Sequence, residues 1–264
     1  MSNSKNDNAV NHSPSGDGGL NGDCIIILAG GLGTRLRSVV SDLPKCMAPV
    51  NGKPFLAYVI NHFQQQGIND FIFSLGYKHE TIIEYLSQST IHHSPITIHY
   101  SIEEEPLGTG GAIKKACTLT NNKNVLVTNG DTLFKANVSS LQKFHQEKNA
   151  ECTVALKPME NFNRYGVIEL NDDASVKSFH EKKQYEQGLI NGGLYMLNIE
   201  SFLNKPLPEK FSFETAYLEK FYTQNNMYGL VQDEYFIDIG IPEDFARAQK
   251  EFMPTFPAWE ITKN

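Results

Sequence analysis

The chain has 264 residues, of which 40% are hydrophobic and 20% charged, and its formal net charge is −7 at pH 7. This length can bury a substantial core, and an acidic balance argues against a nucleic-acid partner. No apolar run reaches the ~18 residues of a membrane helix, and the N-terminus lacks the pattern of a signal peptide, so no membrane partner is expected. The cysteines are Cys24, Cys46, Cys117 and Cys152, without a C-x-x-C pair. They predict reduced thiols and a cytoplasmic protein.

The chain divides into a polar start, one domain and a short end. Residues 1–23 are rich in Ser, Asn, Gly and Asp and poor in large apolar groups. Such a segment cannot bury enough surface to offset the entropy lost on ordering, so we predict a disordered N-terminal tail. A single domain is expected over residues 24–252, followed by a C-terminal extension at 253–264 with two prolines and the only tryptophan.

The first half of the domain, residues 24–150, alternates between strand and helix patterns. Short apolar runs, typical of buried parallel strands, alternate with segments in which apolar residues recur at helical spacing. The expected strands cover 24–28, 71–75, 96–102 and 125–128, and the expected helices cover 54–66, 80–86 and 110–119. This alternation predicts an α/β fold with a Rossmann-like open, mainly parallel sheet flanked by helices.

The second half, residues 151–252, has a different pattern. Short strands separated by turns are expected at 153–156, 165–170, 176–179 and 194–198. They favour a small antiparallel extension of the sheet. Helices are expected at 213–222 and 242–252, with a strand at 234–239 between them.

Three glycines follow the first strand in the stretch ILAGGLGTRLRSVVSDLPKCMAP, residues 27–49. Glycine lets backbone N–H groups approach a phosphate closely, and the start of a helix favours anions. Thr34 adds a hydroxyl donor, and Arg35 presents a planar fork that suits phosphate oxygens. Lys45 follows Pro44 and can bring a point charge from across a pocket. The stretch therefore predicts an anion site.

Two well-known phosphate loops do not fit this stretch. The dinucleotide pattern GxGxxG begins with Gly31 and Gly33, but Leu36 stands where the third glycine belongs. The Walker pattern GxxxxGK[ST] is absent from the sequence. A purely structural glycine turn would leave Arg35 and Lys45 unexplained.

Two aspartates stand at the ends of apolar strands. Asp131 lies in VLVTNGDT and Asp238 in YFIDIG. Ligand sites in open α/β sheets form at strand ends, and carboxylate oxygens suit Mg²⁺. Acidic strand ends can also be merely solvated or act as helix caps, and the sequence spacing leaves open whether the two aspartates meet.

At this point a family resemblance becomes specific. The motifs GGLGTRL and PKCMAPVNGKP resemble the signature of the sugar-1-phosphate nucleotidylyltransferases, although that signature has proline at the position of Cys46. EEPLGTGGAIKKA, NGDTLF, RYGVIEL, FHEKK, LINGGLYML, FSFE and FIDIGIPEDF extend the resemblance over about residues 24–252. The combination is most similar to the bacterial D-glycero-D-manno-heptose-1-phosphate guanylyltransferases.

The resemblance implies a reaction, a cofactor and a set of site residues. GTP and a heptose 1-phosphate would give GDP-heptose and pyrophosphate by in-line attack on the α-phosphate, with Mg²⁺ as cofactor. The implied catalytic residues are Arg35, Lys45 and Asp131, and the implied metal ligands are Asp131 and Asp238. The implied nucleotide contacts are Leu28, Ala29, Gly30, Gly31, Gly33, Thr34, Arg35, Gly108 and Thr109. The implied sugar-phosphate contacts are Gly166, Glu181, Lys182 and Asn191.

Several alternatives stay open at the level of the sequence. Gly108 and Thr109 also fit a simple turn in which Thr109 caps a helix, and exposed Glu–Lys pairs such as Glu181–Lys182 are common on hairpins. The substrate alternatives are mannose 1-phosphate, or dTTP or UTP with another hexose 1-phosphate. A glycosyltransferase is disfavoured because no Asp-x-Asp pair includes Asp131, and a non-catalytic sensor is disfavoured because the charged motif residues are present. Homo-oligomerisation is left open.

Overall fold

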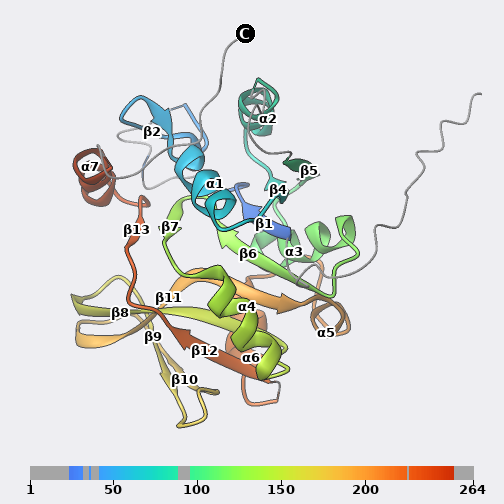
Figure 1. The fold of residues 1–264 in the computed structure, drawn as a ribbon, viewed down its shortest axis with the longest axis vertical. Coiled ribbons are helices and arrows are strands. Elements are labelled where there is room, and N and C mark those ends of the chain that lie inside the picture. The colour runs from blue at the N-terminus through green and yellow to red at the C-terminus, as the bar shows by residue number, and fades with distance from the viewer. Residues whose placement is uncertain (1–23, 32–35, 37–41, 89–95, 225, 253–264) are drawn as a thin grey trace, which may run out of the picture.

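The computed structural model describes residues 24–31, 36, 42–88, 96–224 and 226–252. The expected tail at 1–23 and the expected extension at 253–264 lie outside these residues. Within the described part, nine strands form one sheet in the order β10-β9-β11-β6-β1-β4-β5, with β8 beside β11 and β12 beside β8 (Figure 1). No helix among the described residues is long and apolar enough to cross a bilayer.

The parallel part of the sheet comes from the first half of the chain. It consists of β1 (Cys24–Leu28), β4 (Asp70–Leu75), β5 (Thr97–Ile102) and β6 (Asn124–Asn129), with β1 between β4 and β6. Side chains of β1 alternate between the two faces, so Ile25 and Ile27 join one apolar core while Cys24 and Ile26 join the other. Burial on both faces explains why this strand is a continuous apolar run. The four cysteines are free and buried.

Helices cover both faces of the sheet. Buried residues of α1 (Phe55–Gln65), α2 (His79–Ser87), α4 (Val138–Glu147) and α7 (Pro242–Glu251) belong to the first core. Those of α3 (Gly108–Ala116), η3 (Cys117–Leu119), α5 (Ile199–Leu203), η4 (Glu214–Leu218) and α6 (Glu219–Phe221) belong to the second core. The segment predicted as one helix at 213–222 is a π-helical turn, η4, followed by the short α6.

The second half adds an antiparallel part to the same sheet. β11 (Tyr185–Asn198) is antiparallel to β6 and to β8 (Cys152–Phe162), and β9 (Val167–Leu170) is antiparallel to β10 (Val176–His180). β12 (Met227–Val231) runs parallel to β8. The expected fold class is confirmed, with β8 and β11 longer than predicted.

Two small two-stranded sheets lie beside the main sheet. β7 (Thr132–Phe134) pairs antiparallel with β13 (Phe236–Asp238), and β2 (Pro49–Val50) pairs with β3 (Lys53–Pro54). The 3-10 turn η2 (Lys45–Met47) precedes β2. These short elements position the charged residues described next.

Candidate active site

Two acidic side chains meet near the carboxyl ends of the parallel strands. Asp131 follows β6 after Gly130, and Asp238 ends β13. Asp238 lies opposite Thr132 in the β7–β13 pair, and the Ile239 N–H donates to the Asp131 carbonyl at 3.1 Å. The two aspartates come together because β7 and β13 pair, although they are far apart in sequence.

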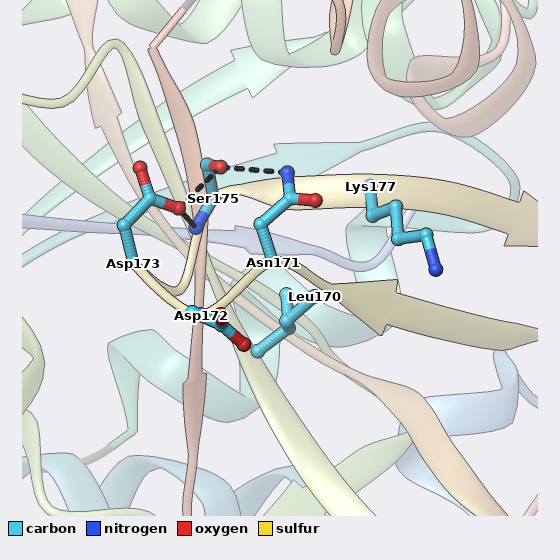
Figure 2. Close-up of a pocket in the computed structure, with 6 residues that line it drawn as sticks. All are labelled: Leu170, Asn171, Asp172, Asp173, Ser175 and Lys177. Carbon is cyan, nitrogen blue, oxygen red and sulfur yellow. Dashed lines mark hydrogen bonds between the residues drawn. The ribbon is translucent and has the colours of Figure 1, made fainter.

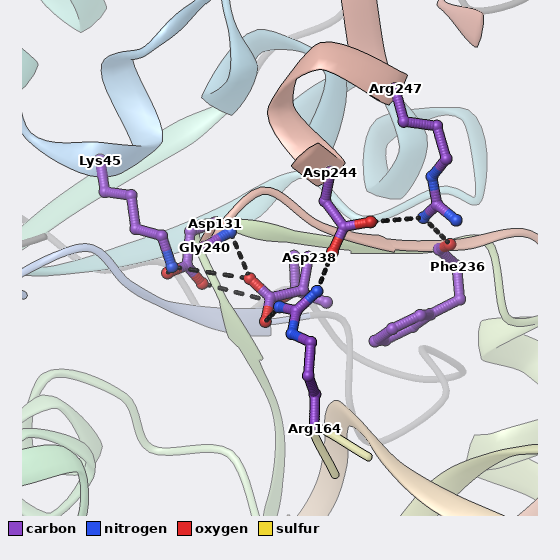
Figure 3. Close-up of polar contacts among 9 residues, drawn as sticks. Lys45, Asp131, Arg164, Phe236, Asp238, Gly240, Asp244 and Arg247 are labelled. Carbon is purple, nitrogen blue, oxygen red and sulfur yellow. Dashed lines mark hydrogen bonds and ion pairs between the residues drawn. The ribbon is translucent and has the colours of Figure 1, made fainter. Parts of the chain in front are cut away.

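Lys45 lies between the two carboxylates (Figure 3). Its Nζ forms an ion pair with Asp131 Oδ2 and lies 3.5 Å from Asp238 Oδ1. Only 14% of the Lys45 side chain is exposed, so solvent screens these attractions weakly. Pro44 directly precedes the turn η2 that starts at Lys45. Cys46 in this turn is buried, and burial raises the pKa of its thiol to about 12, so it packs as a neutral group.

The described part of the glycine-rich loop leaves the sheet at the same edge. β1 ends at Leu28, and Gly30 and Gly31 follow after Ala29. The Ala29 N–H donates to the Ser74 carbonyl, near the end of β4, at 2.8 Å. Because β1 is parallel to β6, whose end leads to Asp131, the loop and the acidic pair share one edge of the sheet. Gly33, Thr34 and Arg35 lie outside the described residues.

Glu103 lies between this loop and α3, and the sequence interpretation did not single it out. Its Oε2 accepts a hydrogen bond from the Leu107 N–H at 2.8 Å, just before α3 begins. Its Oε1 packs against Gly30, where a Cβ would come within 2.8 Å of that oxygen. A side chain at position 30 would displace this oxygen and crowd the Gly76 backbone nitrogen, which would lie 3.1 Å from its Cβ. The run of three glutamates after β5 is the signal that could have identified it.

Helix α3 begins at Gly108, two residues earlier than predicted. Its N-cap is Leu107, which makes no side-chain capping bond. Thr109 Oγ1 instead accepts a hydrogen bond from the Phe213 N–H at 2.9 Å. The alternative in which Thr109 caps this helix is therefore wrong, and its hydroxyl links α3 to the segment before η4.

Strand pairing gathers the residues that were expected to hold the sugar phosphate. β9 pairs with both β10 and β11 at its first residue, Val167. Gly166 precedes β9, Glu181 and Lys182 follow β10, and Asn191 lies on β11 beside this point. The segments that carry these residues thus meet at one end of the β9–β10 hairpin.

The side chains in this group differ in their environment. Asn191 Nδ2 donates to the Tyr195 hydroxyl at 2.8 Å, and its Oδ1 accepts from the Gly193 N–H at 3.0 Å. Glu181 and Lys182 are exposed. A ligand can therefore reach Glu181 and Lys182 directly, whereas Asn191 already has partners for both ends of its amide.

The other end of the β9–β10 hairpin forms an open pocket (Figure 2). It is lined by Leu170, Asn171, Asp172, Asp173, Ser175 and Lys177. Asp173 Oδ1 accepts from the Ser175 N–H at 2.9 Å, and Asn171 Nδ2 donates to Ser175 Oγ at 2.9 Å. These bonds are the internal contacts of a tight turn, and the turn lies at the opposite end of the hairpin from Gly166 and Glu181.

Gly240 and Arg164 complete the surroundings of the acidic pair, and sequence reasoning missed both. The Gly240 N–H donates to Asp238 Oδ1 at 2.7 Å, and a Cβ at this position would lie 2.7 Å from Lys45 Nζ. Arg164 Nη2 lies 3.6 Å from Asp238 Oδ2, and Nη1 of the same side chain pairs with Asp244. The motif RYGVIEL contained Arg164, but nothing in the sequence pointed to its partners on β13 and α7.

The donor set of the acidic pair fits a hard divalent cation. Asp131 and Asp238 offer carboxylate oxygens on the two sides of one ammonium group. Among the described residues no group of three or more His, Cys, Asp or Glu side chains could hold a metal. Mg²⁺ is commonly bound through one or two carboxylates, with the remaining positions filled by water and substrate phosphates. The pair therefore suits a cation that shares its ligands with a bound nucleotide.

An open α/β sheet that collects a glycine-rich loop, a lysine and two aspartates at its carboxyl edge is the architecture of the nucleotide-diphospho-sugar transferases. The chain belongs to the nucleotidyl transferase family, whose model matches residues 24–253. Its sequence is 51% identical over 226 residues to a D-glycero-alpha-D-manno-heptose 1-phosphate guanylyltransferase of Aneurinibacillus thermoaerophilus, covering 86% of this chain and 96% of that protein.

A second curated relative and a solved structure are also similar to this chain over most of their length. The D-glycero-alpha-D-manno-heptose 1-phosphate guanylyltransferase of Campylobacter jejuni is 46% identical, over 83% of this chain and 96% of that protein. The crystal structure of HddC from Yersinia pseudotuberculosis complexed with GMP-PN is 38% identical, with a TM-score of 0.77 over 87% of this chain and 99% of that chain. The predicted family is thereby confirmed.

Proposed function

We propose that this protein joins GTP to D-glycero-D-manno-heptose 1-phosphate and releases GDP-heptose and pyrophosphate. The observation that carries the proposal is the position of Lys45 between Asp131 and Asp238 at the edge of the sheet where the glycine-rich loop emerges. Identity of 51% to a heptose 1-phosphate guanylyltransferase supports the choice of substrates.

The reaction needs two polyanions to be held together. An oxygen of the sugar phosphate attacks the α-phosphorus of GTP in line, the bond to the bridging oxygen of the β-phosphate breaks, and pyrophosphate leaves with that electron pair. The protein's task is to orient the reactants and to offset the charge between them. Lys45 supplies a weakly screened positive charge at this place, and Arg35 is proposed to contribute a second one from the glycine-rich loop.

Asp131 and Asp238 are proposed to hold the divalent cation, Mg²⁺. When bound, Mg²⁺ neutralises phosphate oxygens and fixes their geometry. Lys45 has an ammonium group with three donors, so it could pair with phosphate oxygens as well as with these carboxylates.

Glu103 offers a physical reason for guanine. Guanine presents two adjacent donors, N1–H and N2–H₂, which a carboxylate can accept together. Uracil and thymine present one N–H between two carbonyl oxygens, and a carboxylate repels both of these oxygens. Glu103 lies between Gly30 and the start of α3, the two segments expected to border the base, and we propose that it reads guanine there. Gly108 and Thr109 complete this proposed border, whereas Gly166, Glu181, Lys182 and Asn191 are proposed for the sugar phosphate.

A substrate matrix tests this function. Purified protein is incubated with GTP, UTP, dTTP or ATP, each with heptose 1-phosphate, mannose 1-phosphate or glucose 1-phosphate, and pyrophosphate release is measured with Mg²⁺ or with EDTA. The fastest release is expected for GTP with the heptose phosphate in Mg²⁺, with none in EDTA. Pyrophosphate release that is fastest with mannose 1-phosphate, or with UTP or dTTP, contradicts the substrate assignment. No release with any pair contradicts the enzymatic function.

A further inference from the structure

Arg164 lies in the connection between β8 and β9 and reaches two elements from the end of the chain. Its Nη1 pairs with Asp244 in the first turn of α7, and its Nη2 lies 3.6 Å from Asp238 Oδ2 at the end of β13 (Figure 3). The guanidinium also lies over the ring of Tyr165 at 5.3 Å, and that ring packs edge-on against Phe236 at 5.9 Å. Arg164 therefore holds β13 through an ion pair and through a stacked aromatic neighbour.

The two oxygens of Asp238 face different partners. Oδ1 accepts the Gly240 N–H at 2.7 Å and faces Lys45 Nζ at 3.5 Å, on the side of Asp131. Oδ2 faces Arg164 on the other side. The terminal torsion of an aspartate is broad, so its carboxylate turns easily unless both oxygens are held. Arg164 restrains the second oxygen through this ion pair alone, since its hydrogen bond goes to Asp244.

Arg164 is itself held by a second pair of charges. Asp244 Oδ1 lies 3.6 Å from Arg247 Nη2, and this nitrogen donates to the Phe236 carbonyl at 3.3 Å. Positive and negative groups therefore alternate from Lys45 through Asp238 and Arg164 to the start of α7. A planar guanidinium can pair with two carboxylates at once, which the compact ammonium of lysine does poorly.

We propose that Arg164 is a positioning residue for the reaction, which orients Asp238 toward the divalent cation that it would share with Asp131. The inference rests on the proposed function. Because Arg164 stands two residues before Gly166, it also ties the proposed sugar-phosphate segment to the metal-facing carboxylate. Its action passes through Asp238, without direct contact with the reacting atoms.

The test compares Arg164→Gln with Arg247→Gln. Both variants remove one positive charge from the same network, but only Arg164 contacts Asp238. Mn²⁺ binding is measured by electron paramagnetic resonance without nucleotide. The gain in GTP affinity caused by Mn²⁺ is measured by calorimetry. Loss of a nearby positive charge alone would tighten cation binding, whereas loss of an orienting partner weakens it.

The expected results separate these two effects. Arg164→Gln weakens Mn²⁺ binding, and reduces the Mn²⁺-dependent gain in GTP affinity, by about 10-fold or more, as is usual when a partner of a metal ligand is removed. Arg247→Gln changes both quantities by less than about 3-fold, and Arg164→Lys restores part of the loss. Unchanged or tighter Mn²⁺ binding in Arg164→Gln overturns the proposal, as does an equal loss in both glutamine variants.

Failure of the proposed function and failure of the role of Arg164 are shown by different measurements. Wild-type protein that releases no pyrophosphate in the substrate matrix contradicts the function. The Mn²⁺ titration of the wild type and the variants still decides the role of Arg164, because it needs neither turnover nor nucleotide. A melting temperature measured for each variant separates a local effect on Asp238 from general loss of the fold.

Discussion

Lys45 holds a positive charge between two carboxylates, and its contribution is expected to be catalytic. Lys45→Ala should lower kcat/KM for GTP and the sugar phosphate by about 10²-fold or more, since removal of one group that stabilises developing charge commonly has this effect. The measurement is pyrophosphate release at several substrate concentrations, with circular dichroism to check folding. Lys143→Ala, at a side chain that is 78% exposed, is the matched control and should keep the full rate. A wild-type rate in Lys45→Ala contradicts the proposed site.

Glu103 is expected to determine the choice of base. In Glu103→Gln the amide can still accept the Leu107 N–H, but it offers guanine one donor in place of a second acceptor. The ratio of kcat/KM for GTP to that for UTP should fall by about 10- to 100-fold, the size expected for one two-point contact. Glu104→Gln, at the exposed neighbouring residue, should leave the ratio unchanged. An unchanged ratio in Glu103→Gln would remove Glu103 from the base site.

At the scale of residues, sequence motifs identified some of the site residues, and tertiary contacts identified others. Asp131 and Asp238 could be chosen from sequence because carboxylates at strand ends indicate a ligand site, and Lys45 because it follows the glycine-rich loop within a family motif. Arg164 could not, because its meaning depends on partners in other elements, and Glu103 was overlooked although it begins a run of three glutamates. A motif identifies a residue type at a position, whereas an ion pair requires the tertiary fold.

At the scale of elements, the parallel strands were the easiest to predict. Burial on both faces makes β1 and β6 continuous apolar runs, and their predicted limits differ from the observed ones by at most one residue. Helix α4 was not predicted, because Val138 and Leu141 are the only large aliphatic groups on its buried face. The pairing of β7 with β13, which assembles the site, joins two short strands that are far apart in the sequence, and only β13 was predicted, as a strand at 234–239.

Two buried histidines on helices give a prediction for stability. Burial lowers the pKa of His62 on α1 and of His145 on α4 from 6.5 to about 4. For each histidine the pKa in the folded state lies below the pKa in the unfolded state. The stability that the neutral, buried ring contributes is therefore fully present above pH 6.5 and is lost as the pH falls toward 4. The free energy of unfolding should drop by about 2 kcal/mol per histidine between neutral pH and pH 5.

Urea denaturation at pH 7.5 and pH 5 measures this effect. His145→Gln should make the difference between the two pH values smaller by about 2 kcal/mol, whatever its effect at neutral pH. The same pH dependence in His145→Gln and in wild type would show that this histidine does not take up a proton on unfolding.

At the scale of the whole molecule, an acidic protein has to bind two anions. Acidic residues outnumber basic ones by 30 to 23, so attraction cannot come from the overall charge. Positive charge therefore has to be supplied locally, by Lys45 from η2 and Arg164 from the β8–β9 connection, together with the cation proposed for Asp131 and Asp238. These elements come from both halves of the chain, and β11 joins the halves by pairing with both β6 and β8. The sequence predicted the fold class, the family and a site with residues from both halves, but not the place of Arg164 in it.

The central physical claim is that ammonium and carboxylate groups from distant segments form one active site. In this site a metal-bound nucleoside triphosphate is held next to the attacking sugar phosphate. A crystal structure with GTP and Mg²⁺ tests it most directly. The account predicts a metal ion bound by Asp131 and Asp238, with the α-phosphate within hydrogen-bonding reach of Lys45. A nucleotide bound elsewhere on the molecule, or a metal ion that touches neither aspartate, would contradict it.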